Sequence, residues 1–303
     1  MAHLLRVQCF TVPADGNLAG DDQRLDRPFG HLSPQELFTW RSNTASGDFG
    51  DGGPQTRGID DLFARDMHHG IADSLTALLG KPIEKSNALV VPTALYPFRG
   101  GATLAGRMIR GQSKSPLCNF GRNELGVLEL SMLPSIDEHL WMEQVAAGDA
   151  LLVFGGDVLF LTYWMQTSGL ADFLPTLTTT TYVGVSAGSM VATSLIGETY
   201  VDPPQGSVPD HTAHHVTFDG PDGPFDRLFV TTDDLGLVDC SIIPHHEHPD
   251  HVDACGESAA LWASQLPTTT YAIGEHAALV VEDGITSVIG DGTVRRFDAS
   301  LDA

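Results

Sequence analysis

The chain is poor in cysteine, in basic side chains and in long apolar segments. Its four cysteines (Cys9, Cys118, Cys240 and Cys255) are scattered without any Cys-x-x-Cys pair, so they predict reduced thiols of a cytoplasmic protein and argue against a disulfide framework. No segment approaches the roughly 20 apolar residues that a membrane-spanning helix needs. The N-terminal segment also lacks the apolar run of a signal peptide. We therefore expect neither a membrane partner nor a secretion signal.

Positive charge is scarce as well. The 16 Lys and Arg residues face 39 Asp and Glu residues, which gives a net charge of −23. A surface of this sign repels the phosphates of nucleic acids and of anionic membranes, so we expect neither as a partner. The chain has 303 residues, of which 42% are hydrophobic, and this is enough for one large domain or two small ones.

From about residue 70 onward, segments of strand and helix character alternate. Strands are predicted at 87–91, 127–130, 150–154, 178–185, 240–243 and 271–273, and helices at 71–79, 136–146, 159–168, 253–265 and directly after residue 185. This alternation predicts an α/β fold with a doubly wound, mostly parallel sheet and helices on both faces. A long polar loop is expected over about 197–225. Three C-terminal strands (277–281, 286–289 and 293–297) separated by Asp-Gly turns predict a β-meander.

Residues 11–66 differ from the rest in being polar and rich in Gly and Asp. We expect a first strand at about 3–12, then a long excursion with one short helix at 34–41. The predicted division is therefore a first strand with a lid-like excursion over 1–66, and the main α/β domain over 67–303.

The most informative segment is GVSAG at 184–188, a Gly-x-Ser-x-Gly motif between a predicted strand and a predicted helix. The two glycines remove side chains where strand and helix would collide, so the backbone can turn sharply and push Ser186 Oγ into a cleft. The amide of Ala187 would lie at the start of the helix, where an unpaired N–H can donate to an oxyanion. The alternative is a tight strand–helix turn in which the serine has no chemical role.

A serine nucleophile needs a base that takes its proton. His245 directly follows a buried strand and a proline, which predicts a rigid position suited to a general base. His246 is the alternative base, and a structural role for His245 also stays open. Glu275 lies between two apolar strand segments, where a carboxylate needs a partner, so it is the preferred group to orient the imidazole. Asp202 is the alternative acid, and a simple Ser–His dyad is a third arrangement.

The pair Gly155-Gly156 follows the strand at 150–154 and allows close backbone approach. The Gly156 amide is therefore a candidate second oxyanion donor, although an ordinary turn between strand and helix is the alternative. Active sites of doubly wound sheets lie at the carboxyl ends of the strands. The loops that carry Gly156, Ser186 and His245 are thus expected to meet there.

Two further clusters predict no cofactor. Histidines at 211–215 and 245–251 show no zinc-ligand spacing, so no metal is expected. The Gly-rich segment 100–106 matches neither the dinucleotide-binding nor the phosphate-loop pattern, and Arg107 and Arg110 beside it are expected at the surface.

Four motifs in order resemble peptidase E (aspartyl dipeptidase) and its relative cyanophycinase, serine hydrolases on a class I glutamine-amidotransferase-like fold. They are FGGDVLFL (154–161), VGVSAGSMVA (183–192), LGLVDCSIIPHHEHPD (235–250) and YAIGEHAALVV (271–281). The resemblance covers about residues 70–290. It implies a Ser186–His245–Glu275 triad, oxyanion donors at Gly156 and Ala187, and a small peptide or amide as substrate. The chain order Ser, His, acid differs from the Ser, acid, His order of α/β-hydrolases.

The sequence also departs from this family. The family places an arginine after the catalytic histidine to hold the substrate's aspartate, whereas residues 246–262 contain four acids and no Arg or Lys. A substrate with a free amine or a basic side chain suits this loop better. Residues 4–70 weakly resemble the start of a RibD C-terminal, dihydrofolate-reductase-like domain, but reductase activity is not expected. A non-peptide amide or ester as substrate, a catalytically silent binding protein and a homodimer remain open.

Overall fold

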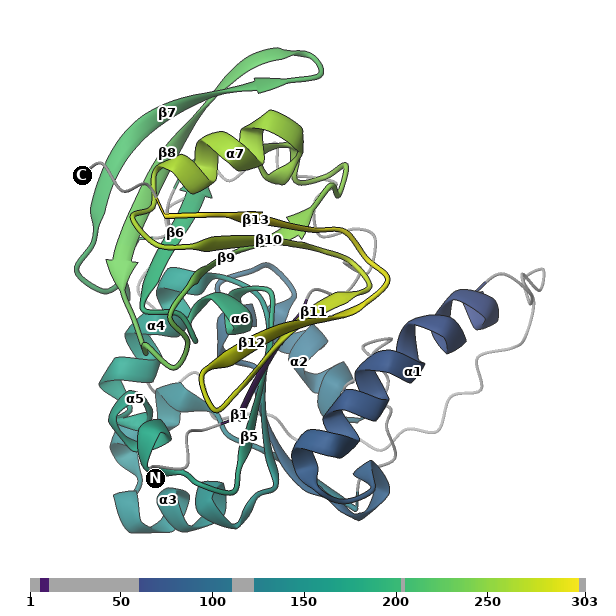
Figure 1. The fold of residues 1–303 in the computed structure, drawn as a ribbon. Coiled ribbons are helices and arrows are strands. Elements are labelled where there is room, and N and C mark those ends of the chain that lie inside the picture. The colour runs from purple at the N-terminus through teal and green to yellow at the C-terminus, as the bar shows by residue number, and fades with distance from the viewer. Residues whose placement is uncertain (1–5, 11–59, 111–122, 203–204, 300–303) are drawn as a thin grey trace, which may run out of the picture.

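The computed structural model describes residues 6–10, 60–110, 123–202 and 205–299. A seven-stranded sheet forms its centre, in the order β12-β11-β1-β5-β4-β2-β3 (Figure 1). The strands are β1 (Arg6–Phe10), β2 (Asn87–Val91), β3 (Glu124–Val127), β4 (Ala150–Val153), β5 (Thr181–Val185), β11 (Ala277–Glu282) and β12 (Ile285–Gly290). The five strands β1 to β5 run parallel, and β11 and β12 join the sheet as antiparallel neighbours. This confirms the predicted α/β fold with a mostly parallel sheet.

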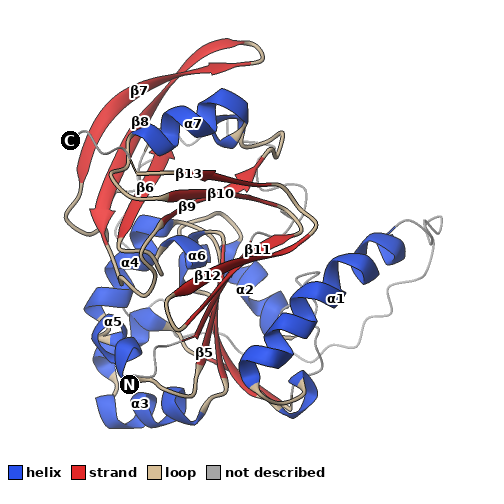
Figure 2. Cartoon of the chain, viewed as in Figure 1, coloured by secondary structure: helices blue, strands red, loops and turns tan. Residues whose placement is uncertain are grey.

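Helices cover both faces of this sheet (Figure 2). Successive residues of a strand point to opposite faces, so the fully buried β4 and β5 supply two separate hydrophobic cores. On one face pack α1 (Asp60–Leu79) and α2 (Gly101–Ile109); on the other pack α3 (Glu138–Ala147), α4 (Val158–Thr167) and α5 (Leu170–Phe173). Core residues of the first face include Leu75, Met108, Leu152 and Val183. Core residues of the second face include Trp141, Leu161, Leu151 and Tyr182.

Two smaller three-stranded sheets extend the fold beyond the carboxyl ends of the parallel strands. One has the order β13-β10-β9, with β9 (Ser241–His246) parallel to β10 (Thr270–Gly274) and β13 (Val294–Phe297) antiparallel to β10. The other, β6-β8-β7, is antiparallel and comprises β6 (Leu195–Tyr200), β7 (Thr212–Gly220) and β8 (Gly223–Asp233). Helix α7 (Gly256–Ser264) packs against β7 and β9 (Figure 1).

Three sequence predictions about elements are wrong in detail. The expected polar loop over 197–225 instead holds β6, β7 and the start of β8. The helix after Ser186 ends after one turn, as α6 (Ala187–Met190), and the following apolar residues belong to β6. The strand predicted at 127–130 lies at 124–127, and a 3-10 helix (Leu130–Ser135) follows it.

The C-terminal antiparallel strands are present, but their pairing differs from a simple meander. Asp283 and Gly284 both have positive φ and form the two-residue turn between β11 and β12, as the Asp-Gly pattern predicts. At Asp291-Gly292 the chain instead crosses to the other sheet, and β13 pairs with β10. A Cβ at Gly292 would collide with the carbonyl oxygen of Glu275. The crossing at Gly292 therefore packs directly against the backbone of Glu275, which is a candidate site residue.

The structure also bears on the cysteines, the arginines beside the Gly-rich segment and the question of a membrane helix. Cys9, Cys240 and Cys255 are free thiols, and Arg107 and Arg110 are exposed on α2. Among the described residues, no helix has the length and apolar character needed to span a bilayer. The short helix expected at 34–41, most of the excursion and Cys118 lie outside the described residues. The division at residue 66 stays a prediction.

Candidate active site

Ser186 lies on a sharp turn between the buried strand β5 and α6. Its backbone has φ 50° and ψ −116°, a region that non-glycine residues rarely adopt. A Cβ at Gly184 would collide with the carbonyl of Gly188, and a Cβ at Gly188 with the carbonyl of Val153. Only glycines at these two positions allow β5, α6 and β4 to approach so closely. The Gly-x-Ser-x-Gly segment therefore forms a strained elbow that presents the serine side chain.

His245 lies directly against this serine. Its Nε2 is 2.8 Å from Ser186 Oγ, which is hydrogen-bond distance. The ring of His251 stacks on it with centroids 4.3 Å apart and planes 11° apart, so the imidazole is held from its face as well as its edge. The alternative base, His246, points elsewhere: it is buried, and its Nδ1 donates to the carbonyl of Ala254 at 2.6 Å.

Burial, with smaller contributions from the neighbouring His251 and His248, lowers the pKa of His245 to about 3. The imidazole is therefore neutral at working pH and can accept a proton from the serine. When Nε2 accepts, the ring proton sits on Nδ1. That atom is buried and has no hydrogen-bond partner. A buried donor without an acceptor costs about 1–3 kcal/mol, so the site calls for an acceptor at this atom.

The low pKa of His245 predicts a rate profile without an acid limb from this residue. The second-order rate constant for reaction of Ser186 with a fluorophosphonate should change little between pH 8 and pH 5. A base with the ordinary pKa of about 6.5 would lose activity about 30-fold at pH 5, because about 97% of it would be protonated. A titration midpoint between 6 and 7 in this profile would contradict the low pKa of the buried imidazole.

Glu275 lies in the crossing between β10 and β11, close to the histidines but not bonded to His245. Its Oε1 is 3.4 Å from Nε2 of His248 and makes no aligned hydrogen bond. The alternative acid, Asp202, is exposed in the loop after β6. Since Nδ1 of His245 has no partner, neither acid is bound to it in this structure. The structure therefore brings Ser186 and His245 together, whereas Glu275 makes no hydrogen bond to His245.

The Gly155-Gly156 loop packs directly beside the serine. A Cβ at Gly155 would lie 2.8 Å from Cβ of Ser186. Gly156 has φ 142°, and a Cβ there would collide with the carbonyl of Ala94. Within the described part of the chain, the amides of Gly156 and Ala187 donate to no other residue. Both amides are thus free to bind an oxyanion near Ser186. Because α6 has only four residues, amide direction matters more here than a helix dipole.

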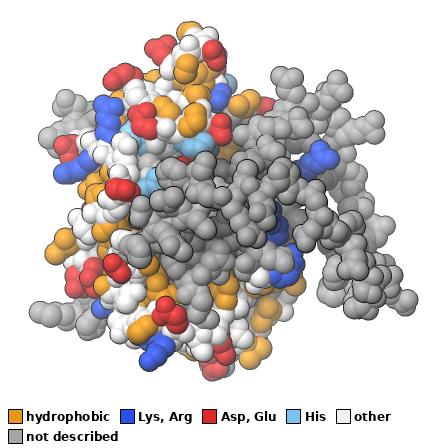
Figure 3. Space-filling model, turned by 90° about the vertical axis from the view of Figure 1, so that its right-hand side faces the viewer, with side chains coloured by type: hydrophobic (Ala, Val, Ile, Leu, Met, Phe, Trp, Pro, Cys, Tyr) orange, Lys and Arg blue, Asp and Glu red, His pale blue; other side chains and the backbone are white. Residues whose placement is uncertain are grey.

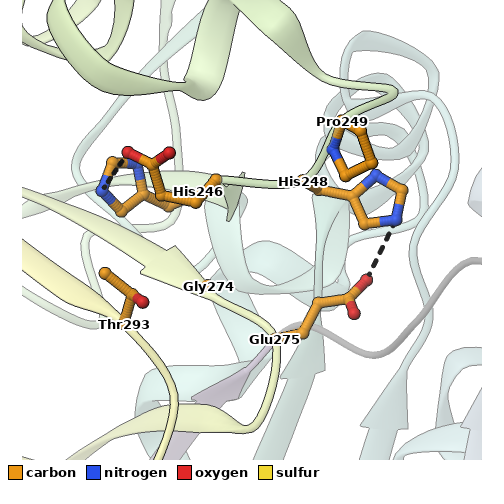
Figure 4. Close-up of a pocket in the computed structure, with 7 residues that line it drawn as sticks. His246, His248, Pro249, Gly274, Glu275 and Thr293 are labelled. Carbon is orange, nitrogen blue, oxygen red and sulfur yellow. Dashed lines mark ion pairs between the residues drawn. The ribbon is translucent and has the colours of Figure 1, made fainter.

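A cavity of about 220 Å³ opens beside the histidine loop (Figure 4). Its lining comes from that loop (residues 246–255) and from the two chain crossings at the carboxyl end of β10, and consists of His246, Glu247, His248, Pro249, Gly274, Glu275 and Thr293. No Lys or Arg lines it. Figure 3 shows histidine side chains gathered near acidic ones on one face of the described protein. Nevertheless, among the described residues no three His, Cys, Asp or Glu side chains are arranged to hold a metal ion.

Sequence reasoning missed an acidic group next to the elbow. Asp157 begins α4, where its Oδ1 accepts from the Phe160 amide at 2.8 Å, and its Oδ2 lies 3.5 Å from the Tyr200 hydroxyl. Burial raises the pKa of Asp157, and burial raises that of Glu198 on β6 to about 8. The nearby carboxylate of Asp253 contributes to the raised pKa of Glu198. The sequence analysis did not identify Glu198 because it assigned most of β6 to a polar loop.

Two arginines that the sequence pattern did not indicate reach the same region, and one of them, Arg295, donates from Nη1 to the carbonyl of Gly256 at 3.0 Å. Arg227 on β8 reaches the histidine loop, where its Nε lies 3.3 Å from Asp253 Oδ2. The Thr199 hydroxyl donates to the same carboxylate oxygen at 2.7 Å. Arg227 therefore offsets one of the loop's four acids, Asp253, and the loop keeps a net negative charge.

Glu198 gives a stability prediction with a definite sign. Its folded-state pKa of about 8 exceeds the ordinary glutamate pKa of 4.5. Between these pH values the unfolded chain releases the proton and the folded protein keeps it, so stability is lost as pH rises. Glu198→Gln should therefore become more stable than the wild type, by on the order of 1–3 kcal/mol at pH 8, but not at pH 4.5. Thermal melts from pH 4.5 to 8, with the exposed Glu143→Gln as control, test this; parallel curves for Glu198→Gln and wild type would refute it.

A sequence model of peptidase family S51 matches residues 65–289. The chain belongs to peptidase family S51. It is thus a serine peptidase of the peptidase E type, which confirms the resemblance carried by the four sequence motifs. A search of curated proteins finds no match.

Two solved structures are similar to this S51 peptidase. The first is a peptidase from an acI-B1 Actinobacterium, with 20% identity and a TM-score of 0.49, covering 76% of this chain and 89% of that one. The second is a candidate peptidase E protein from Listeria monocytogenes EGD-e, with 14% identity and a TM-score of 0.46, covering 72% of this chain and 91% of that one.

Proposed function

We propose that this peptidase cleaves small peptides, in the manner of a dipeptidase, by acyl-enzyme chemistry with Ser186 as nucleophile, His245 as base and Glu275 as the orienting acid. The observation that carries the proposal is the 2.8 Å contact between Ser186 Oγ and His245 Nε2 at a strained elbow. A nucleophile and a base within hydrogen-bond reach are the signature of this chemistry. All three cysteines in the described part of the chain are free thiols, which favours a cytoplasmic location for the protein.

The proposed reaction starts with attack of Ser186 Oγ on the substrate carbonyl while its proton moves to Nε2 of His245. The negative oxygen is held by the amides of Gly156 and Ala187, each contributing about 3–4 kcal/mol to transition-state stabilisation. Glu275 stays ionised and accepts a hydrogen bond from Nδ1–H of the imidazolium, whose formation in this buried place needs a nearby negative charge. The C–N bond then breaks, and His245 returns its proton to the leaving amine.

The second half of the reaction consumes water. His245, neutral again, takes a proton from a water molecule as that water attacks the acyl group on Ser186. The ester bond breaks, the proton passes from Nε2 to Ser186 Oγ, and a carboxylic acid leaves.

The charges around the site favour substrates with a free amine or a basic side chain. Residues 246–262 carry four acids without Lys or Arg, and Arg227, which reaches the loop from β8, is paired with Asp253. A carboxylate side chain on the substrate would meet repulsion here, so an N-terminal aspartate is not the expected preference.

The proposal is tested by incubating the protein with a dipeptide library and measuring the free amines that hydrolysis releases. The wild type should cleave a subset enriched in uncharged or basic N-terminal residues. Ser186→Ala should lose this activity, and Ser264→Ala, an exposed serine on α7, should keep it. If the protein hydrolyses only esters or non-peptide amides, the substrate class is wrong. If it cleaves nothing while well folded, the protein is a binding protein on this fold.

A further inference from the structure

Two buried polar atoms near Ser186 have no hydrogen-bond partner, and one histidine is a neighbour of both side chains that carry them. The atoms are Nδ1 of His245 and Oε1 of Glu275. The ring of His248 lies 6.4 Å from that of His245, measured between centroids, and its Nε2 lies 3.4 Å from Oε1 of Glu275. His248 is thus the neighbour through which the position of Glu275 can be controlled.

Hydrogen bonding decides which nitrogen of His248 carries the proton. The backbone N–H of Asp250 donates to His248 Nδ1 at 3.2 Å, so this nitrogen is an acceptor. In a neutral imidazole the proton then sits on Nε2. Nε2 is the atom that faces Glu275 (Figure 4). His248 therefore presents an oriented N–H donor to one oxygen of the carboxylate.

The backbone of His248 is also fixed. Its amide donates to the carbonyl of His245 at 3.0 Å, and its carbonyl accepts from the amide of His251 at 2.9 Å. Pro249 follows it and restrains the turn further. The charged groups facing its ring are Glu275 and Asp250, whose Oδ2 lies 4.0 Å from Nδ1. No Lys or Arg lines the cavity, so His248 is the donor placed to hold Glu275.

We propose that His248 is a positioning residue, which holds one oxygen of Glu275 so that the other can accept a hydrogen bond from Nδ1–H of His245. This inference rests on the proposed triad. The separation of 3.4 Å is long for a hydrogen bond, and such contacts commonly tighten when substrate binds. A carboxylate held at one oxygen reaches the imidazole in a single orientation, whereas a released Glu275 can turn into the cavity.

The test is the rate at which a small fluorophosphonate labels Ser186, because this probe needs no knowledge of the substrate. His248→Leu should lower the maximal labelling rate about 10- to 100-fold and leave the half-saturating probe concentration nearly unchanged. His248→Gln should restore most of the rate, because its amide nitrogen can take the place of Nε2. His248→Asn should not, because its shorter amide cannot reach Glu275. The exposed His139→Leu on α3 is the matched control.

A double-mutant cycle separates action through Glu275 from a general loss of structure. In a Glu275→Ala background, His248→Leu should cause no further loss of rate. The inference is overturned if the two losses multiply, or if His248→Gln and His248→Asn label equally, a comparison that stands even when His248→Leu does not fold. Labelling that persists in Ser186→Ala would instead overturn the proposed nucleophile, whatever His248 does.

Discussion

Replacement of His245 by alanine is expected to slow fluorophosphonate labelling of Ser186 by about 10⁴- to 10⁶-fold. His245 Nε2 is the only base within 2.8 Å of the serine oxygen among the described residues, and burial keeps the ring in its neutral, proton-accepting form. Without it, the serine must react as a neutral hydroxyl. Labelling time courses followed by intact mass give the rate directly.

His246 supplies the control for this experiment, since it was the alternative base. His246→Asn keeps a donor near the position of Nδ1, which bonds the Ala254 carbonyl. Its labelling rate, corrected for the folded fraction, should stay close to that of the wild type. If His246→Asn loses the rate and His245→Ala keeps it, the assignment of the base is wrong.

Gly156→Ala should lower the labelling rate about 10²- to 10³-fold, the loss known for removal of one oxyanion donor. Gly156 has φ 142°, which side chains rarely adopt, and a Cβ would collide with the Ala94 carbonyl. The loop must therefore shift, and its amide leaves the neighbourhood of Ser186. Kinetics of labelling, together with thermal melts, separate this effect from unfolding.

Gly169→Ala is the matched control for Gly156→Ala. Gly169 also has a positive φ, 79°, but its Cβ would meet no atom within 4 Å. This variant should cost about 1–2 kcal/mol of stability from backbone strain and leave the labelling rate unchanged. A folded Gly156→Ala that labels at the wild-type rate would show that this amide does not bind the oxyanion.

The central sheet and the serine elbow could be predicted from sequence because their signals are local. A buried strand followed by Gly-x-Ser-x-Gly permits few backbone paths, and collisions at Gly184 and Gly188 show why. The same reasoning placed the Gly155-Gly156 loop beside Ser186, where the structure has it. Strands buried on both faces, such as β4 and β5, also stand out as short apolar runs.

The outer sheet could not be predicted because its strands are polar. In β7 only Val216 and Phe218 are buried, and the remaining side chains face solvent, so the pattern resembles a loop. Its stability comes from pairing with β8 over nine residues, a long-range contact that no local window contains. The acids Glu198 and Asp253 and the base Arg227 meet through this sheet. The contact between Glu275 and His248 was not predicted either, because it also joins residues that are far apart in the sequence.

The measurement that tests the account most directly is intact-mass analysis of the protein after reaction with a small fluorophosphonate, followed by peptide mapping. The account predicts one adduct on the wild type, located at Ser186, and none on Ser186→Ala with an unchanged melting temperature. No adduct on well-folded wild type, or an adduct that persists in Ser186→Ala, would contradict the claim that the strained elbow presents an activated serine to His245.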